Sequence, residues 1–316
     1  HASITADSIL QAHRQISSGI HRTPVVTCTT LNQLSGSDLY FKCENFQKIG
    51  AFKIRGGLHA VLSLSPEERK KGVATHSSGN HAQAIAYAAR AVGSKAYIVM
   101  PENSPKVKVD AVRSYEAEIH FCAPNQEARE STLQKIVAET GASFIHPYND
   151  LRVITGQATC AVELMEQVPN LDIILSPVGG GGLLSGTLLS VAYFSPSIKV
   201  YGTEPEGAAD AILSLRSGKI EKAPFINTIA DGLLTTLGDL TFPIIRSRVS
   251  DILTVSDTEI IAALKLCYER MKIVAEPSGV VPLAALLKHP ELFTGKKVGL
   301  IISGGNVDVS KLSGWW

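Results

Sequence analysis

The sequence predicts an α/β protein with two open, twisted and mainly parallel sheets flanked by helices. Segments typical of strands and helices alternate between residues 72 and 149, and the alternation repeats on a larger scale from residue 150 to residue 302. The first 71 residues carry too few strands to fold alone, so we place them with the C-terminal sheet. We therefore expect a large domain of residues 1–71 and 150–316, a small domain of residues 72–149 inserted in it, and a ligand site in the cleft between them.

The N-terminal segment contributes two helices and two extended runs. Ile9, Ala12 and Ile16 recur at helical spacing, which predicts a helix over residues 5–18. Residues 25–27 and 39–43 are typical of strands, and a second helix is expected over residues 53–64. Because this helix begins at Lys53, its positive N-terminal end faces whatever Lys53 faces.

The small domain is expected to hold four strands that alternate with three helices. The strands are predicted at residues 73–76, 96–100, 118–122 and 143–146, and the helices at 81–91, 105–115 and 126–139. The large domain continues with strands at 172–178, 198–203, 251–255 and 297–302, and with helices at 154–167, 183–194, 208–217, 257–273 and 278–288. Residues 224–243 are expected to be mostly loop, and Asp257 is expected to cap the helix that follows.

Composition excludes several classes of protein. A net charge of +1 with scattered lysines provides no basic stripe for nucleic acid. The longest apolar runs are too short to span a bilayer, so no membrane partner is expected. Five cysteines, an odd number without a C-x-x-C pair, argue against a disulfide framework and for a reducing compartment. A cytoplasmic location is the expectation.

One lysine lies in a short run of small and apolar residues, Gly50 to Gly57. Phe52 and Ile54 hold Lys53 close to apolar surface, which favours the neutral amine and makes it a better nucleophile. A neutral amine in such a place suits Schiff-base chemistry with an aldehyde cofactor. The structural alternative is a lysine whose stem lies along apolar surface while its amine reaches water.

Four consecutive glycines, Gly179 to Gly182, lie between a predicted strand and a predicted helix. The backbone N–H groups of such a turn converge on an anion, and phosphate is the expected ligand. The run lacks the G-x-G-x-x-G pattern of dinucleotide-binding folds, so a single phosphate fits better than a pyrophosphate. Glu204, at the end of the next strand, keeps a nicotinamide dehydrogenase open as an alternative, because an acid there can bind a ribose.

Two further turns follow predicted strands. The run from Ser77 to His81 offers amides and two hydroxyls to a carboxylate, and Asn80 offers a hydrogen bond to a phenolic oxygen. Ser303, after the final strand, offers a hydroxyl at another carboxyl end of the large sheet. Capping of a helix and a buried serine cap are the structural alternatives for these two turns.

Four motifs occur in a fixed order: G-A-F-K-I-R-G at 50–56, S-S-G-N-H-A-Q at 77–83, the four glycines, and S-G-G-N at 303–306. Together they resemble the fold-type II pyridoxal-phosphate (PLP) enzymes of the serine/threonine dehydratase family, which have the fold of the tryptophan synthase β subunit. The resemblance covers nearly the whole chain. Within the family, the branch that racemises serine is the most similar, on the strength of residues 76–81, 269–272, 276–277 and 303–308.

The resemblance implies roles for individual residues. Lys53 would carry PLP covalently and act as acid and base on one face of the substrate Cα, and Ser78 would do so on the opposite face. Asn80 would contact the phenolic oxygen, and Ser303 the pyridine nitrogen. Backbone N–H groups of the phosphate turn would come from Gly179, Gly180, Gly181, Gly182 and Leu183. The other cofactor and substrate contacts would come from Phe52, Tyr148, Glu276, Ser77, His81 and Arg129.

The resemblance also implies further ligands and a homodimer. A magnesium or calcium ion would bind Glu204, the carbonyl of Ala208 and Asp210, with waters completing the site; a solvated helix start is the structural alternative. ATP would act as an effector at the dimer interface. Its site would comprise Lys48, Gln83, Tyr115, Lys272 and Asn306.

One departure from the family pattern bears on the chemistry. After His146-Pro147 the animal racemases tend to have asparagine, whereas this chain has Tyr148-Asn149-Asp150. The tripeptide is more similar to plant racemases and to some dehydratases. It leaves open whether the cofactor contact of that asparagine is kept, and how racemisation and elimination are balanced.

The expected activity is racemisation of serine, accompanied by β-elimination of serine to pyruvate and ammonia. Inversion at Cα needs a proton carrier on each face, and Ser78 therefore favours a racemase. A dehydratase for threonine or threo-3-hydroxyaspartate shares every cofactor residue and stays open as the alternative. A nicotinamide dehydrogenase or an inactive nucleotide-binding module is the third hypothesis, and it predicts a protein without the yellow colour of bound PLP.

Overall fold

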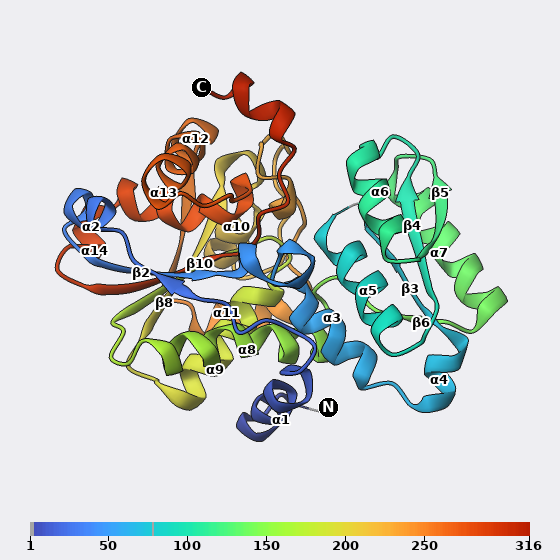
Figure 1. The fold of residues 1–316 in the computed structure, drawn as a ribbon. Coiled ribbons are helices and arrows are strands. Elements are labelled where there is room, and N and C mark those ends of the chain that lie inside the picture. The colour runs from blue at the N-terminus through green and yellow to red at the C-terminus, as the bar shows by residue number, and fades with distance from the viewer. Residues whose placement is uncertain (1–2, 78) are drawn as a thin grey trace.

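The computed structural model describes residues 3–77 and 79–316, and it contains two sheets with helices on both faces of each (Figure 1). The larger sheet is parallel except for its first strand, which pairs antiparallel with the second. Its order is β1 (Val25–Val26), β2 (Asp38–Cys43), β10 (Lys297–Ile302), β7 (Ile173–Pro177), β8 (Lys199–Pro205) and β9 (Asp251–Val255). In sequence order, β1 and β2 of this sheet come before the strands of the smaller sheet, and β7 to β10 come after them.

The smaller sheet is wholly parallel and confirms the predicted alternation of strands and helices. Its order is β5 (Glu118–Cys122), β4 (Ala96–Pro101), β3 (Val73–His76) and β6 (Ser143–Phe144). Alternate residues of one strand face opposite layers: Val73 packs toward α5 (Asn80–Ala91), and Ala74 toward α7 (Gln126–Thr140). Helix α6 (Lys106–Ser114) lies beside α5.

Helices cover both faces of the larger sheet. One face packs against α2 (Thr29–Ser35), α12 (Asp257–Leu266), α13 (Val281–Lys288) and α14 (Pro290–Phe293). The other packs against α8 (Leu151–Gln167), α9 (Gly182–Phe194) and α11 (Thr241–Arg248), with α1 (Ala6–Ile16) outside α8. Helix α10 (Asp210–Ser217) lies near β9, and α4 (Pro66–Lys71) leads into the small sheet.

Helix α3 (Lys53–Leu62) lies between the two sheets (Figure 1). One apolar cluster contains Ile54 and Leu58 of α3, Ala84 and Ile85 of α5, and Val153 of α8. The element that begins with Lys53 is therefore packed from both sides. The residue bounds of the two domains stay a prediction.

Four short helices were not expected from the sequence: α2, α4, α11 and α14. Helix α11 contains Pro243, which lies in the first turn, where a missing N–H costs no hydrogen bond. The expectation that Asp257 caps α12 is wrong. The N-cap is Ser256, whose hydroxyl accepts from the Glu259 amide while the Glu259 carboxylate accepts from the Ser256 amide. The helix also ends early, at Leu266, and a π-helical turn (Cys267–Met271) follows it.

None of the helices in residues 3–77 and 79–316 combines the length and the apolar character that a membrane crossing needs. All five cysteines lie buried with free thiols.

Candidate active site

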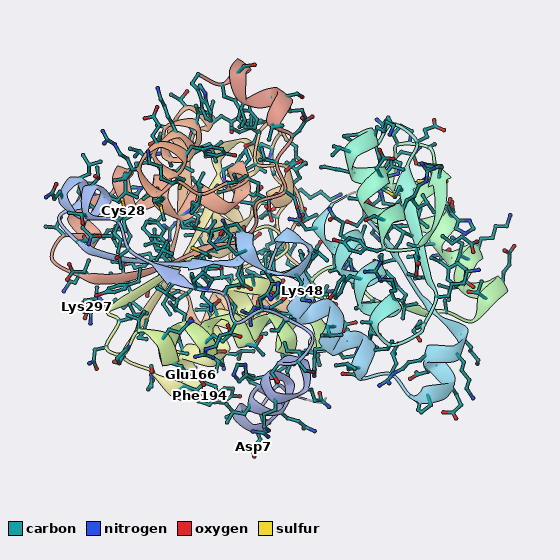
Figure 2. The ribbon with its side chains drawn as sticks, in the orientation of Figure 1. Asp7, Cys28, Lys48, Glu166, Phe194 and Lys297 are labelled. Carbon is teal, nitrogen blue, oxygen red and sulfur yellow. The ribbon has the colours of Figure 1, made fainter. Side chains whose placement is uncertain are left out.

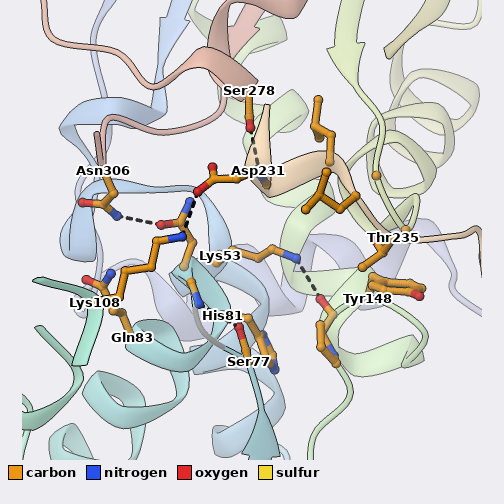
Figure 3. Close-up of a pocket in the computed structure, with 18 of the residues that line it drawn as sticks. Lys53, Ser77, His81, Gln83, Lys108, Tyr148, Asp231, Thr235, Ser278 and Asn306 are labelled. Carbon is orange, nitrogen blue, oxygen red and sulfur yellow. Dashed lines mark hydrogen bonds and ion pairs between the residues drawn. The ribbon is translucent and has the colours of Figure 1, made fainter. Parts of the chain in front are cut away.

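A cavity of about 1280 Å³ lies between the two sheets and is lined by residues of both. Residues that follow β3, β7 and β10 contribute to its wall, namely Ser77, Gly179 and Ser303. The carboxyl ends of parallel strands thus meet at this cavity, as open α/β sheets favour for ligand sites. Figure 3 shows the side chains that project into it.

Lys53 lies at the first residue of α3 and projects into the cavity (Figure 3). Its Nζ donates a hydrogen bond to the Pro147 carbonyl at 3.0 Å and lies 5.3 Å from the centroid of the Phe52 ring. Burial among these groups lowers the pKa of Lys53 to about 8. The shift has the direction expected from its apolar neighbours in the sequence. About a tenth of the amine is therefore neutral at pH 7.

The glycine turn forms another wall of the cavity and leads into α9. Gly181 has φ 95°, a backbone conformation that side chains rarely tolerate. Thr241, on α11, donates from its hydroxyl to the Gly180 carbonyl at 2.7 Å. Residues 179–182 have no side chains and line the cavity at the start of α9, which suits a phosphate. Leu183 lies in the first turn of α9 and lines the cavity too.

Tyr148 packs its ring directly on the glycine turn. A Cβ atom on Gly180 would lie 2.2 Å from the Cδ1 atom of that ring, so a side chain there could not coexist with it. The His146 ring meets the Tyr148 ring edge-on at 4.7 Å between centroids, and Thr235 lies beside it (Figure 3). Asn149, next in the chain, accepts from the Leu240 amide at 2.9 Å. Residues 146–149 are thus tied to the loop that precedes α11.

Asn80 is held between two partners at the start of α5. Its Nδ2 donates to Glu276 Oε1 at 2.9 Å, and its Oδ1 accepts from Asn306 Nδ2 at 2.8 Å. Burial, with the negative charge of Asp231 adding to it, raises the pKa of Glu276 to about 8, which favours the neutral carboxyl group at pH 7. The two partners fix which way the Asn80 amide points.

Other predicted contact residues surround the same space. Ser303, whose carbonyl accepts from the Phe52 amide at 3.0 Å, links the end of β10 to the residue before Lys53. Ser77 accepts from the Gly79 amide at 3.1 Å. His81 is buried, and burial, reinforced by the charge of Lys53, lowers its pKa well below the usual value. Ser78 lies outside the described residues.

The cavity wall formed by α7 carries Arg129. Its Nε is buried and has no hydrogen-bond partner among the described residues. Burial lowers the pKa of nearby His76, and the charge of Arg129 adds to that effect. An anionic group in the cavity would therefore meet a positive charge on this side.

Glu204, Ala208 and Asp210 come together at the end of β8 and the start of α10. Glu204 accepts from the amides of Ala211 and Ile212, at 3.1 and 2.8 Å, and Asp210 accepts from the Leu237 amide at 3.0 Å. Burial raises the pKa of Glu204 to about 8 and that of Asp210 to about 7. Both carboxylates are buried, so a solvated helix start does not describe them, and carboxylate oxygens are the ligands that a magnesium or calcium ion takes. Across the described ranges, no group of three or more His, Cys, Asp or Glu side chains is arranged to hold a metal, so such an ion would depend on these two carboxylates, a carbonyl and waters.

Four of the five residues predicted for ATP lie on α5 or contact it, and among the described residues the structure shows no such contact for Lys272. Lys48, near the centre of the molecule in Figure 2, has its Nζ 5.7 Å from the Tyr87 ring, and Tyr115 packs edge-on against the same ring. Asn306 donates to the Ile49 carbonyl, and buried Gln83 lines the cavity. Lys272 is exposed after the π-helical turn.

Several contacts at the site have no local signal in the sequence. The Lys53 partner is a backbone carbonyl, and Thr241 reaches Gly180 across 61 residues. Lys108 of α6 and Asp231, in the segment between α10 and α11, form an ion pair at 2.8 Å across the cavity (Figure 3). Many other residues of the same types could form such long-range contacts, so the sequence does not indicate which of them do.

An aldehyde cofactor with one phosphate needs a poorly solvated amine and an anion-binding turn facing one space. Lys53 and the glycine turn meet that need, and the fold and the site together define a fold-type II PLP enzyme. The chain belongs to the pyridoxal-phosphate dependent enzyme family, whose model matches residues 16–304.

Individual relatives are similar over almost their full length. A serine racemase of Dictyostelium discoideum is 51% identical, with 99% of this chain and 98% of that protein covered. A β-hydroxyaspartate dehydratase of Paracoccus denitrificans (strain Pd 1222) is 50% identical, with 98% of each covered. The structure of maize serine racemase superposes with a TM-score of 0.95 at 45% identity, covering 99% of this chain and 97% of that one.

Proposed function

We propose that this chain is a PLP-dependent serine racemase that also eliminates water from serine to form pyruvate and ammonia. The observation that carries the proposal is the Lys53 amine, with its lowered pKa, in the same cavity as the glycine turn, in a chain 51% identical to a serine racemase. PLP, when bound, supplies an electron sink for a carbanion at the substrate Cα. The protein residues decide where the proton returns.

In this proposal Lys53 removes or returns the Cα proton on one face, and Ser78 serves the opposite face. The amides of residues 179–183 bind the cofactor phosphate. Asn80, oriented by Glu276 and Asn306, donates to the phenolic oxygen, and Ser303 donates to the pyridine nitrogen. The walls against the cofactor come from Phe52, Tyr148 and Glu276. The substrate carboxylate binds at Ser77, Ser78, Asn80 and His81, with Arg129 nearby.

The proposal includes two regulatory ligands and an assembly. A magnesium or calcium ion binds Glu204, Ala208 and Asp210, supported by the burial of both carboxylates. ATP binds Lys48, Gln83, Tyr115, Lys272 and Asn306, supported by the connection of Asn306 to Asn80. The working form is a homodimer in the cytoplasm.

The decisive test uses each enantiomer of serine, chiral amino-acid analysis and a pyruvate assay. The parent should form D-serine from L-serine and the reverse, with pyruvate as a second product. Ser78→Ala should abolish interconversion and elimination from D-serine, yet keep some pyruvate formation from L-serine, because Lys53 serves one face alone. Interconversion near the parent rate in Ser78→Ala would remove Ser78 as the second base.

A second candidate is elimination from 3-hydroxyaspartate, favoured by the 50% identity to a β-hydroxyaspartate dehydratase and by Arg129 on the cavity wall. Its test compares kcat/KM for L-threo-3-hydroxyaspartate, threonine and L-serine. If a second carboxylate binds Arg129, Arg129→Gln should raise KM for hydroxyaspartate more than for threonine. A clear preference for serine in the parent would reject this candidate.

A further inference from the structure

A group of four buried charges lies behind Lys53, on the side away from the cavity. Lys42, Glu44 and Arg55 are fully buried, and Glu163 is 2% exposed. Arg55 donates to both carboxylates: its Nε and Nη2 to Glu44, and its Nη1 and Nη2 to Glu163 at 2.7 and 2.9 Å. Lys42 donates to Glu163 at 2.9 Å. Two positive and two negative charges therefore balance; we call them the charge quartet.

The charge quartet joins three elements at the start of α3. Lys42 lies on β2, Glu44 directly follows that strand, and Glu163 lies on α8. Arg55 comes two residues after Lys53 in α3, and a helix turns by about 200° over two residues. Lys53 therefore points into the cavity while Arg55 points back into the protein. Although burial opposes it, the hydrogen bonds from Arg55 lower the pKa of Glu163 to about 2, so Glu163 is ionised.

The backbone of α3 is also pressed against α8 at this place. The Gly56 amide donates to the Gln157 side chain at 3.0 Å. A Cβ atom on Gly156 would lie 2.5 Å from the Arg55 carbonyl oxygen, so only glycine allows this approach. Thr159 accepts from Arg55 Nη1 at 3.1 Å. The first turn of α3 thus has little freedom to shift relative to α8.

A buried ion network is poor evidence for stability, because desolvation of the charges offsets their attraction. A guanidinium that binds two carboxylates does fix the orientation of its side chain, because its N–H donors form a rigid planar fork. We propose that Arg55 is a positioning residue. Held by Glu44 and Glu163, it fixes the first turn of α3, so that the Lys53 amine meets the cofactor and the substrate Cα from one direction. The inference rests on the proposed role of Lys53.

The test uses two holoenzyme variants and one control. Arg55→Lys keeps the charge and removes the fork. Arg55→Met with Glu44→Gln removes one charge of each sign and leaves the pair of Lys42 and Glu163, so no uncompensated charge is buried. The control is Arg22→Gln, which removes an exposed arginine whose partner, Glu166, is also exposed, lies on α8 and is labelled in Figure 2.

The measurements are kcat and KM for L-serine per mole of bound cofactor, the rate of cofactor release on dilution, and the melting temperature. Both variants should lose at least tenfold in kcat with KM within about threefold, and should release cofactor at least tenfold faster. The control should match the parent. Cofactor release needs no turnover, so it tests Arg55 even if the parent acts on neither enantiomer of serine.

Two outcomes overturn the proposal. Either variant, folded and loaded with cofactor, could retain the parental kcat and release rate. The second outcome is that both variants fail to fold. The charge quartet would then be needed for folding and not for the position of Lys53.

Discussion

The contact between Tyr148 and the glycine turn can be tested by adding one methyl group. In Gly180→Ala the new Cβ would lie 2.2, 2.2 and 2.4 Å from three atoms of the Tyr148 ring, well inside van der Waals contact. The ring cannot move away freely, because His146 meets it at 4.7 Å. Overpacking of this kind costs about 2 kcal/mol. With about 2.1 cal/mol/K of unfolding entropy per residue, that cost lowers the melting temperature by about 3 °C.

The cofactor should report the same strain, because the amides that bind its phosphate would be displaced. A loss of about 2 kcal/mol in binding is about a thirtyfold rise in the Kd for PLP. In a Tyr148→Ala background the obstacle is gone, so the added methyl should cost nearly nothing. The double-mutant cycle would then show a coupling of about 2 kcal/mol.

The assay is calorimetric melting and PLP titration of the parent, both single variants and the double variant. Gly314→Ala is the matched control, since a Cβ there meets nothing within 4 Å and its φ is not positive. If Gly180→Ala costs the same with and without the Tyr148 ring, Tyr148 does not restrain the turn and the reasoning fails.

Three other predictions follow from the site. The Lys53 amine has a lowered pKa, about 8, so its neutral fraction rises about tenfold per pH unit up to pH 8 and then levels. The rate of acetylation of Lys53 in the apoprotein, measured by mass spectrometry with exposed Lys219 as the reference, should follow that curve. An inflection near pH 10 would contradict it. Glu276 has a raised pKa, about 8, so its contribution to stability is present at low pH and is lost as pH rises from about 4.5 through 8; relative to the parent, the melting temperature of Glu276→Gln should therefore rise steadily between about pH 4.5 and 8 and level above that, and parallel curves would reject the shift. Chelation should lower the melting temperature by about 4 °C if the free cation concentration before chelation is about 100 times its Kd. Asp210→Asn should abolish that difference.

Much of the candidate site was predictable because its signals are local. Lys53 among apolar residues, the four glycines and the polar turns after strands are each visible within ten residues. The rule that carboxyl ends of parallel strands share one edge then brings them together without any knowledge of side-chain packing. The structure places Lys53, Gly179 and Ser303 around one cavity, as that rule requires.

The partners of these residues were not predictable in the same way. Asn80 binds Glu276 across 196 residues, and Asn149 binds Asp239 across 90. The family resemblance marks Glu276 as a cofactor contact, but it does not indicate the bond to Asn80. Nothing marks Asp239, because an aspartate in a loop is common. Helix α11 was missed for a local reason, since Pro243 suggests a break although it occupies a first turn.

The charge quartet could be predicted from the sequence only in part. Lys42 stands between Phe41 and Cys43 in a strand whose other residues are mostly buried, and Arg55 stands in an apolar helix start. A charge in such a run indicates a buried partner, because an isolated buried charge is too costly to persist. Two buried bases therefore require about two buried acids, and α8 offers Glu163 within an otherwise apolar stretch. Once Lys42 and Arg55 are known to be buried, the number and sign of their partners follow. The fork of Arg55, which meets Glu44 and Glu163 at once, exists only where β2, α3 and α8 converge.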